Sequence, residues 1–527
     1  MPRLLALLIA LTTAVPARAQ RPTAIADGES LQGEKLASGI AVFRGVPYAL
    51  PPVGDLRWRP PAPRPIHAGR RDATRFGPSC MQGDRLRAWA KGIATALGTV
   101  DRFTPAPLDT SEDCLYLNVW AATPVGRANQ PVLVWIHGGS NLNGEGHDPW
   151  YDGENLARRG VVVVTINYRL GIFGFLAHPA LTEESGTGSS GNYALLDQVE
   201  ALRWVRRNIA AFGGDPSRVT IAGESAGAID VMHLMAAPLA KGLFQRAIAE
   251  SGAPMARLLP LRAAESQGLA ALKALDLDST DPLRSLRAVP AGEILAAGNK
   301  AMATGQLMGP IVDGRVLPEM TVQAFEAGRQ HRVPLLLGSN ALEMTTLRAY
   351  MPRFVQTPAG YARWLGVLLG PSAQTVQARF PATTPAEVDR QSLEVFTDVF
   401  FTCPTRIAAR TSAGAAPVYL YQFTRVYPGG ESLGAFHAME IPYVFGNWSA
   451  WLPASADDRR MSDAMMGYWT RFAATGDPNG AGAPTWPRYD GTASYLEFGA
   501  TPVARQGLKG EVCDAIEPRL RATWATR

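Results

Sequence analysis

The stretch from Val219 to Gly227 constrains the fold of this chain more than any other. It reads Val-Thr-Ile-Ala-Gly-Glu-Ser-Ala-Gly, an apolar run followed by the pattern G-x-S-x-G. The β-branched run predicts a buried strand, and apolar residues at helical spacing as far as Met235 predict a helix after the motif. A serine on a sharp turn between strand and helix is a nucleophile elbow. The pattern therefore predicts Ser225 as a nucleophile.

Strand-like and helix-like runs alternate on both sides of this motif, in a chain that is 46% hydrophobic and 18% charged. Alternation of this kind predicts an α/β fold, with a mostly parallel central sheet flanked by helices. Two stretches rich in Ala and Leu are predicted as an inserted helical cap, over residues 258–305 and 357–410. No repeat or linker divides the chain, so residues 20–527 are predicted to form a single domain. The predicted buried strands are 131–136, 161–167, 219–222, 245–250 and 334–337.

The first 19 residues have the features of a secretory signal peptide. Arg3 precedes an apolar run from Leu4 to Val15, and Ala17-Arg18-Ala19 forms an A-x-A cleavage site. The apolar run is too short to span a membrane as a helix. We therefore expect residues 1–19 to be removed and the protein to be exported, to the periplasm or the extracellular space, with no membrane span.

Charge and cysteine content narrow the possible functions. Loss of Arg3 and Arg18 lowers the formal charge from +5 to +3, and the basic residues are scattered, so no nucleic-acid partner is expected. The four cysteines of an exported chain predict two disulfides, for which three pairings are possible. No Cys or His spacing typical of a metal site is present, so neither a metal nor a cofactor is expected. The cysteines are Cys80, Cys114, Cys403 and Cys513.

A serine nucleophile needs a histidine base, and in this fold the order along the chain is Ser, acid, His. Of the seven histidines, only His331 and His437 follow both the nucleophile and the predicted elbow helix, which carries His233. His331 stands before a predicted strand, whereas active groups gather at the carboxyl ends of strands. His437 follows a strand, and we predict it as the base. An ordinary imidazole would titrate near ~6.5.

Two carboxylates compete for the role of the acid that orients the base. Glu343 follows the predicted strand at 334–337 by a few loop residues. Asp313 lies in Ile-Val-Asp-Gly, and Asp-Gly after an apolar pair is usually a tight turn. We predict Glu343 as the acid and keep Asp313 as the alternative.

The oxyanion of an acyl-transfer reaction needs preorganised N–H donors. Gly-rich backbone after a strand supplies them in His137-Gly-Gly-Ser, and the residue after the nucleophile adds another. The predicted donors are Gly139, Ser140 and Ala226. Asn141 and Asn143 follow directly and are predicted to line the substrate pocket. The alternative left open is that both amides bond to nearby backbone and face no substrate.

The sequence resembles the type-B carboxylesterases of the α/β-hydrolase superfamily, which are related to cholinesterases and bacterial para-nitrobenzyl esterases. The resemblance covers nearly the whole mature chain. The motifs that carry it are Phe43-Arg-Gly-Val-Pro-Tyr-Ala, Ser111-Glu-Asp-Cys-Leu-Tyr-Leu-Asn, Trp135-Ile-His-Gly-Gly, Asn167-Tyr-Arg-Leu-Gly, Ala211-Phe-Gly-Gly-Asp-Pro, Gly223-Glu-Ser-Ala-Gly, and His437 with Glu440-Ile-Pro-Tyr-Val-Phe-Gly.

This resemblance implies the same triad of Ser225, Glu343 and His437. It also implies disulfides Cys80–Cys114 and Cys403–Cys513, and ion pairs Arg44–Glu112 and Arg169–Asp197. Ser251 matches a hydroxyl that hydrogen-bonds the triad acid, although a simple turn serine before Gly252 is the alternative. Glu224, directly before the nucleophile, is expected to support the triad.

The chain departs from the family pattern near the predicted oxyanion hole. Most members carry Gly or Ala and then an aromatic residue where this chain has Ser140 and Asn141. Asp230 stands where a small hydroxyl residue is more common, and Met344 replaces the glycine after the acid. These departures bear on the substrate rather than on the reaction, and two amides beside the hole favour a polar ester.

We therefore expect a secreted or periplasmic serine carboxylesterase that hydrolyses small-molecule carboxylic esters through an acyl-enzyme intermediate. One alternative is a non-catalytic, cholinesterase-like binding protein, whose relatives typically lose the triad that this chain keeps. Another is amidase or lactonase use of the same site. The sequence predicts neither the natural ester nor the oligomeric state.

Overall fold

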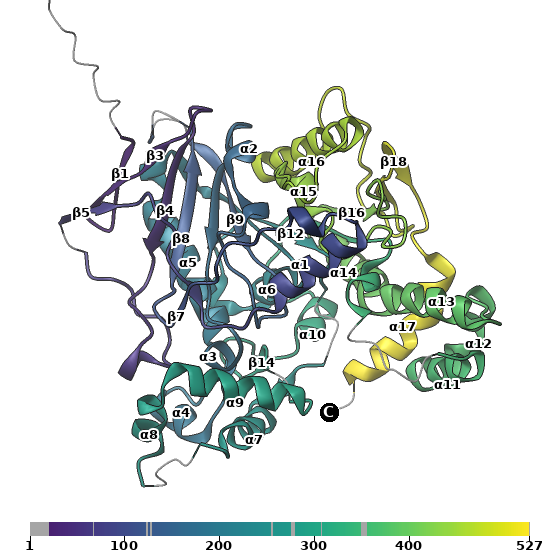
Figure 1. Cartoon of the computed structure of the whole chain (residues 1–527), viewed down its shortest axis with the longest axis horizontal. Coiled ribbons are helices and arrows are strands. Elements are labelled where there is room, and N and C mark those ends of the chain that lie inside the picture. Colours follow the sequence, from purple (N-terminus) through teal and green to yellow (C-terminus); the bar gives the residue numbers. More distant parts are fainter. Residues whose placement is uncertain are drawn as a thin grey trace, which may run out of the picture.

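The architecture comes from a computed structural model of the chain, which describes residues 21–66, 68–122, 125–126, 129–253, 257–275, 280–306, 308–348 and 356–525. The predicted signal peptide, residues 1–19, lies outside the described residues. Apolar β-branched runs form the middle of a large twisted sheet, and helices lie against both of its faces (Figure 1). This is the α/β-hydrolase fold that the alternation of strands and helices predicts.

The large sheet is mixed, with a parallel centre. Every pairing from β10 across to β17 is parallel, and the outer pairings of β8, β4, β3 and β18 are antiparallel. Within the described residues its order is β18 (Pro502–Arg505), β17 (Tyr495–Phe498), β16 (Val418–Phe423), β15 (Leu335–Asn340), β12 (Arg246–Glu250), β11 (Gly214–Glu224), β9 (Gln130–Ile136), β10 (Val162–Ile166), β8 (Tyr116–Ala121), β4 (Ala41–Pro47) and β3 (Glu34–Lys35).

Side chains of the central strands alternate between two hydrophobic cores. On β9, Val132 and Val134 join the core that contains helices α5 (Tyr193–Asn208) and α6 (Ala226–Ala236). Leu133 and Trp135 point to the opposite face and join the core formed with α16 (Ala456–Thr475). Because successive side chains of a strand face opposite sides, a strand buried on both faces is apolar throughout.

Helices inserted between the strands form two groups at the periphery of the sheet (Figure 1). The first group lies next to α4 and the second next to α17, and these are the two stretches predicted as a cap. The first group is α7 (Leu261–Leu272), α8 (Pro282–Ala288) and α9 (Ala291–Ala303); the second is α11 (Pro358–Leu369), α12 (Ala373–Arg379) and α13 (Pro385–Thr397). The next helix, α14 (Cys403–Ala413), packs instead against β15 and β16, where Ile407 and Ala408 join the core. The remaining helices are α1 (Arg85–Ala96), α2 (Glu154–Ala157), α3 (Gly171–Phe175), α4 (Pro179–Glu184), α10 (Thr321–Glu326), α15 (Ile441–Phe445) and α17 (Gly510–Ala525).

Three small sheets complete the described strands. They are β1 (Thr23–Ala26) with β2 (Glu29–Gln32) and β5 (Gly69–Asp72), β6 (Ser79–Cys80) with β7 (Thr110–Ser111), and β13 (Leu259–Pro260) with β14 (Ile311–Val312). In the part of the chain that the structure describes, no helix is both long enough and apolar enough to cross a membrane.

Both implied disulfides are present, Cys80–Cys114 and Cys403–Cys513. One of the two implied ion pairs is also present. The Arg169 guanidinium lies 2.6 Å from a carboxylate oxygen of Asp197, and both side chains are buried.

The other implied pair, Arg44–Glu112, is wrong. Glu112 binds the guanidinium of Arg57, whose Nε donates over 2.6 Å. Arg44 instead pairs with Glu34 on the neighbouring strand β3. The reason is tertiary, because Arg57 is buried where it also donates to carbonyl oxygens of the first inserted group, including that of Val289 at 2.8 Å.

Candidate active site

Ser225 lies on the turn between β11 and α6, with φ 56° and ψ −122°. This conformation is strained for a residue with a side chain and is held by close packing. A Cβ on Gly227 would lie 2.0 Å from the carbonyl oxygen of Ile136, and one on Gly223 would lie 2.6 Å from the backbone of Gly227. Only glycine fits at either position, which explains the two glycines of the motif physically.

His437 and Glu343 meet on neighbouring loops. Glu343 begins a short turn after β15, and His437 lies in the loop after β16. Nδ1 of His437 is 2.7 Å from Oε2 of Glu343, and the other Glu343 oxygen accepts from the backbone N–H of Asn340 at 2.7 Å. A carboxylate in this position favours the tautomer with the proton on Nδ1, which leaves Nε2 able to accept a proton.

The alternative acid and base lie elsewhere. Asp313 accepts backbone N–H bonds from residues 315–317 and a hydroxyl bond from Ser189, so its carboxylate organises a turn. His331 bonds through Nε2 to the carbonyl oxygen of Ala237 at 2.9 Å. The structure therefore brings Glu343, not Asp313, to His437.

The outer nitrogen of His437 has a second acidic neighbour. Its Nε2 lies 3.2 Å from Oε1 of Glu224, the residue before the nucleophile. Among the described residues, the Ser225 hydroxyl has no hydrogen-bond partner. The contact between Nε2 and Glu224 suits the protonated imidazole of His437, because Nε2 then carries a hydrogen that it can donate. In the neutral ring with the proton on Nδ1, Nε2 is an acceptor for the Ser225 hydroxyl.

Three further described carboxyl groups lie buried in the same region and influence one another, and sequence reasoning gave a supporting role to Glu224 alone. They are Glu224, Glu250 and Glu440, each at most 4% exposed. Glu250 accepts from the indole N–H of Trp469 at 2.7 Å. The apolar context of Ala249-Glu250 on a central strand was the available signal for a buried carboxyl.

The resemblance implied that the Ser251 hydroxyl bonds the predicted acid, Glu343. The structure gives Ser251 a different partner. Its hydroxyl donates to Oε1 of Glu440 at 3.0 Å, and the side-chain amide of Asn340 donates to the other Glu440 oxygen. Because Asn340 also binds Glu343 through its backbone, Ser251 supports the acid indirectly. The reason is spatial: Glu440, three residues after His437, lies between Ser251 and Asn340.

This cluster changes the proton affinities of its members. Burial lowers the pKa of His437, but the negative charge of Glu224 and the hydrogen bond to Glu343 outweigh it and raise that pKa to about 9. The ordinary imidazole value expected from sequence is therefore wrong. Burial, followed by repulsion from Glu343, raises the pKa of Glu440 to about 7. Burial raises the pKa of Glu224, the positive charge of His437 opposes this rise, and repulsion from Glu440 and Glu343 adds to it.

The predicted oxyanion loop follows β9 and runs beside the nucleophile. A Cβ on Gly138 would lie 3.1 Å from the Cβ of Ser225. Gly139, Ser140 and Asn141 have φ values of 104°, 61° and 59°, three consecutive residues in the left-handed region. Ala226 is the first residue of α6. The three predicted donors thus lie in the two segments that meet at Ser225.

Asn141 and Asn143 differ in their surroundings. The amide of Asn141 donates to Asp230 at 3.1 Å and its oxygen accepts from the Tyr168 hydroxyl at 3.1 Å, so its polar atoms are directed at the protein. This differs from both expectations for Asn141, because the partners of its amide are side chains of the protein and not nearby backbone or substrate. The Asn143 side chain is 5% exposed and has no hydrogen-bond partner among the described residues.

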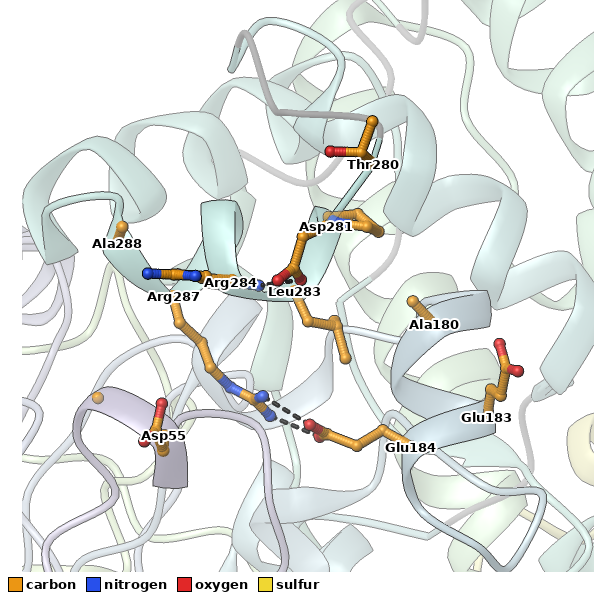
Figure 2. Close-up of a pocket in the computed structure, with 12 residues that line it drawn as sticks. Asp55, Ala180, Glu183, Glu184, Thr280, Asp281, Leu283, Arg284, Arg287 and Ala288 are labelled. Carbon is orange, nitrogen blue, oxygen red and sulfur yellow. Dashed lines mark hydrogen bonds and ion pairs between the residues drawn. The ribbon is translucent and has the colours of Figure 1, made fainter.

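A large surface cavity, of about 750 Å³, lies away from these groups (Figure 2). It is bordered by α4, α8 and the turn at Gly54–Leu56, and the ion pair between Arg287 and Glu184 spans it. Its lining includes none of Ser225, Glu343 and His437. Its walls carry both signs of charge, and the chemistry described above does not involve it.

A mostly parallel sheet with a serine elbow, and with an acid and a histidine on the loops after later strands, defines the α/β-hydrolase class. The Carboxylesterase family profile matches residues 24–516. The chain belongs to this family, and it is a carboxylic ester hydrolase of the serine type.

Several relatives of this chain are named as esterases, in agreement with the family profile. Fumonisin B1 esterase of Sphingopyxis macrogoltabida is 37% identical over 524 residues, covering 96% of this chain and 92% of that protein. Para-nitrobenzyl esterase of Bacillus subtilis is 36% identical, covering 86% and 89%. Among solved structures, a thermophilic PNB esterase has a TM-score of 0.81 at 33% identity, covering 94% of this chain and all of that one. A Geobacillus stearothermophilus carboxylesterase has a TM-score of 0.79 at 35% identity, covering 96% and 100%.

Proposed function

We propose that Ser225, Glu343 and His437 form the catalytic triad of this esterase. The observation that carries the proposal is the 2.7 Å contact between His437 and Glu343 beside a serine held in a strained elbow. Ser225 attacks the ester carbonyl, and His437 takes its proton and then returns it to the leaving alcohol. Glu343 holds the imidazole tautomer and stabilises its cation.

The negative oxygen of the tetrahedral intermediate binds to the backbone N–H groups of Gly139, Ser140 and Ala226. Such donors act on charge that develops only in the transition state, and each contributes about 3–4 kcal/mol to lowering the barrier. Water activated by His437 then releases the carboxylic acid and restores the free serine. Glu224 and Ser251 support this exchange, Glu224 by stabilising the imidazolium and Ser251 through Glu440.

The preferred ester is polar in this proposal. Asn143 supports it, because its side-chain amide has no hydrogen-bond partner among the described residues and a substrate oxygen could pair it. Asn141 contributes through the protein rather than through the substrate.

The mature enzyme is proposed to be residues 20–527, acting as one unit outside the cytoplasm after removal of residues 1–19. Two disulfides support this location, because disulfides persist in oxidising compartments. Mass spectrometry of the protein from the native host, separated into cell fractions, tests it. Recovery of the protein from the cytoplasmic fraction with residues 1–19 still attached would contradict export.

Paired esters test the substrate proposal. Each pair shares one alcohol and one acyl length but differs in a terminal carboxylate or hydroxyl on the acyl group. We expect a higher kcat/KM for the polar member, and Asn143→Leu should reduce that preference about tenfold. An unchanged preference in the Leu variant would remove Asn143 from substrate recognition.

A further inference from the structure

Asp230 links the nucleophile helix to the oxyanion loop. It lies on α6, five residues after Ser225, and its Oδ1 accepts from the side-chain amide of Asn141 at 3.1 Å. Its other oxygen accepts from the amide of Gln198 on α5 at 2.6 Å. Asp230 and Gln198 are fully buried and Asn141 is 4% exposed. The contact thus joins two segments that are 89 residues apart.

The loop at this contact has a conformation that its own sequence does not favour. Three consecutive residues have positive φ, and two of them, Ser140 and Asn141, carry side chains. Such residues cost about 1–3 kcal/mol each and persist only where the surroundings hold them. The loop is therefore expected to relax unless tertiary contacts restrain it.

The restraints converge on Asn141. Its carbonyl oxygen accepts from the backbone N–H of Gly171 at 2.7 Å. The Tyr168 hydroxyl lies within donating distance of two acceptors, the carbonyl oxygen of His137 at 2.7 Å and the amide oxygen of Asn141 at 3.1 Å. These contacts tie the loop to the segment that follows β10. Within the part of the chain that the structure describes, the bond to Asp230 alone ties the Asn141 side chain to the helix that follows Ser225.

Burying the Asp230 carboxyl lowers the stability of the fold, so a purely structural role does not explain this residue. Among the described residues it has no ion-pair partner, and a buried carboxyl with no cation is strongly disfavoured. An apolar residue would satisfy packing between α5 and α6 without this cost. The placement of a costly acceptor at this point indicates that its hydrogen bond to Asn141 matters.

We propose that Asp230 is a positioning residue for the oxyanion hole, acting through Asn141 to hold Gly139 and Ser140 at bonding distance from the oxyanion formed on Ser225. The proposal rests on the proposed function, which assigns the donors. Asp230 does not touch substrate. Its effect belongs to the transition state, because the negative oxygen exists only there, so kcat and not KM depends on it.

The central variant is Asp230→Leu, which keeps the number and branching of the heavy atoms but leaves the amides of Asn141 and Gln198 without an acceptor. We expect kcat to fall about tenfold to hundredfold with KM within about threefold, as displaced donors produce. Affinity for a trifluoromethyl ketone, which forms an oxyanion adduct with the serine, should fall by a similar factor. Asp230→Asn keeps an acceptor for Asn141 and should restore kcat to within about threefold.

The matched control is His233→Leu on the same helix. His233 is equally buried, but its ring bonds Thr321 of α10 at 2.6 Å, away from the loop. Its loss should lower the stability of the fold while kcat and ketone affinity stay near those of the wild type. Equal losses of kcat in the Asp230→Leu and His233→Leu variants would show a general structural effect and overturn the proposal.

A second variant approaches the contact from the loop. Asn141→Gly removes the amide while tolerating positive φ, and it should reproduce the kcat loss even if Asp230→Leu fails to fold. Full kcat in either Asp230→Leu or Asn141→Gly would overturn the positioning role. Labelling of Ser225 by a fluorophosphonate and its loss in Ser225→Ala test the proposed function separately, so the two failures are distinguishable.

Discussion

Nε2 of His437 lies 3.2 Å from Oε1 of Glu224, the residue that immediately precedes the nucleophile. Nδ1 of the same ring lies 2.7 Å from Glu343, so the imidazole stands between two carboxyl groups. An ion pair on the nitrogen that must take the serine proton stabilises the imidazolium. The base is therefore harder to deprotonate than an ordinary histidine, and the pH dependence of hydrolysis should report this.

We predict that Glu224→Gln shifts the rising limb of kcat/KM to lower pH. Catalysis needs the neutral imidazole, which exists above its pKa, and burial opposed by Glu224 and Glu343 raises that pKa to about 9. Removal of one negative neighbour should lower the apparent pKa by about 1 unit or more. Glu250→Gln, in the same cluster but not in contact with His437, is the control and should shift it less. If kcat/KM rose over the same pH range in the wild type and in Glu224→Gln, Glu224 would be uncharged over that range and the prediction would be wrong.

Ser225→Ala should lower kcat by about 10⁴-fold or more, with unchanged folding by circular dichroism. The hydroxyl at the elbow is the only group in the proposal that forms the acyl bond. A fluorophosphonate should label the wild type once, at Ser225, as read by peptide mass spectrometry. Labelling that persists in the alanine variant would assign the nucleophile to another residue.

Glu343→Gln should lower kcat by about 10³–10⁴-fold, because an amide can present its N–H to Nδ1 and favour the wrong tautomer. The matched comparison is Asp313→Asn. This change weakens the turn that Asp313 organises but leaves the contact between Glu343 and His437 intact. Steady-state kinetics on one chromogenic ester measures both. If Asp313→Asn caused the larger loss, the assignment of the acid would be reversed.

Loss of the Cys403–Cys513 disulfide should destabilise the fold by about 3–5 kcal/mol, since it closes a long loop. The two cysteines are 110 residues apart and tie α17 to the start of α14. Urea unfolding of the Cys403→Ala/Cys513→Ala double variant tests this. The Cys80→Ala/Cys114→Ala variant, with a separation of 34, should lose less. The reverse order would contradict the loop-entropy argument.

Asp230→Asn should make stability less dependent on pH. Burial raises the pKa of Asp230 to about 7 in the folded protein, from an ordinary value of 3.8. Between these values the folded state binds the proton and the unfolded state does not, so wild-type stability falls as pH rises through the window. The slope from one proton is at most ~1.4 kcal/mol per pH unit. Urea midpoints of both proteins from pH 4 to 8 measure it, and parallel curves would contradict the prediction.

The sequence by itself determined the strand, the turn and the helix around Ser225, because short-range patterns specify such elements. The apolar run before Gly223 and the spacing after Gly227 were enough to predict a strand, an elbow and a helix, because strand and helix periods are visible in a short window. The order Ser, acid, His then restricted the base to two histidines, and the position of His437 after a strand selected one. The resemblance to a family implied both disulfides and the Arg169–Asp197 pair.

Only the tertiary structure decided which distant side chains meet. Glu112 pairs with Arg57 rather than Arg44, Ser251 bonds Glu440 rather than Glu343, and Asn141 binds Asp230. The pKa of His437 likewise depends on carboxyl groups from separate parts of the chain. The three pairs named first are 55, 189 and 89 residues apart, so no sequence period relates them. The packing of helices and loops around the sheet sets which buried groups face one another, and burial then makes each pairing strong.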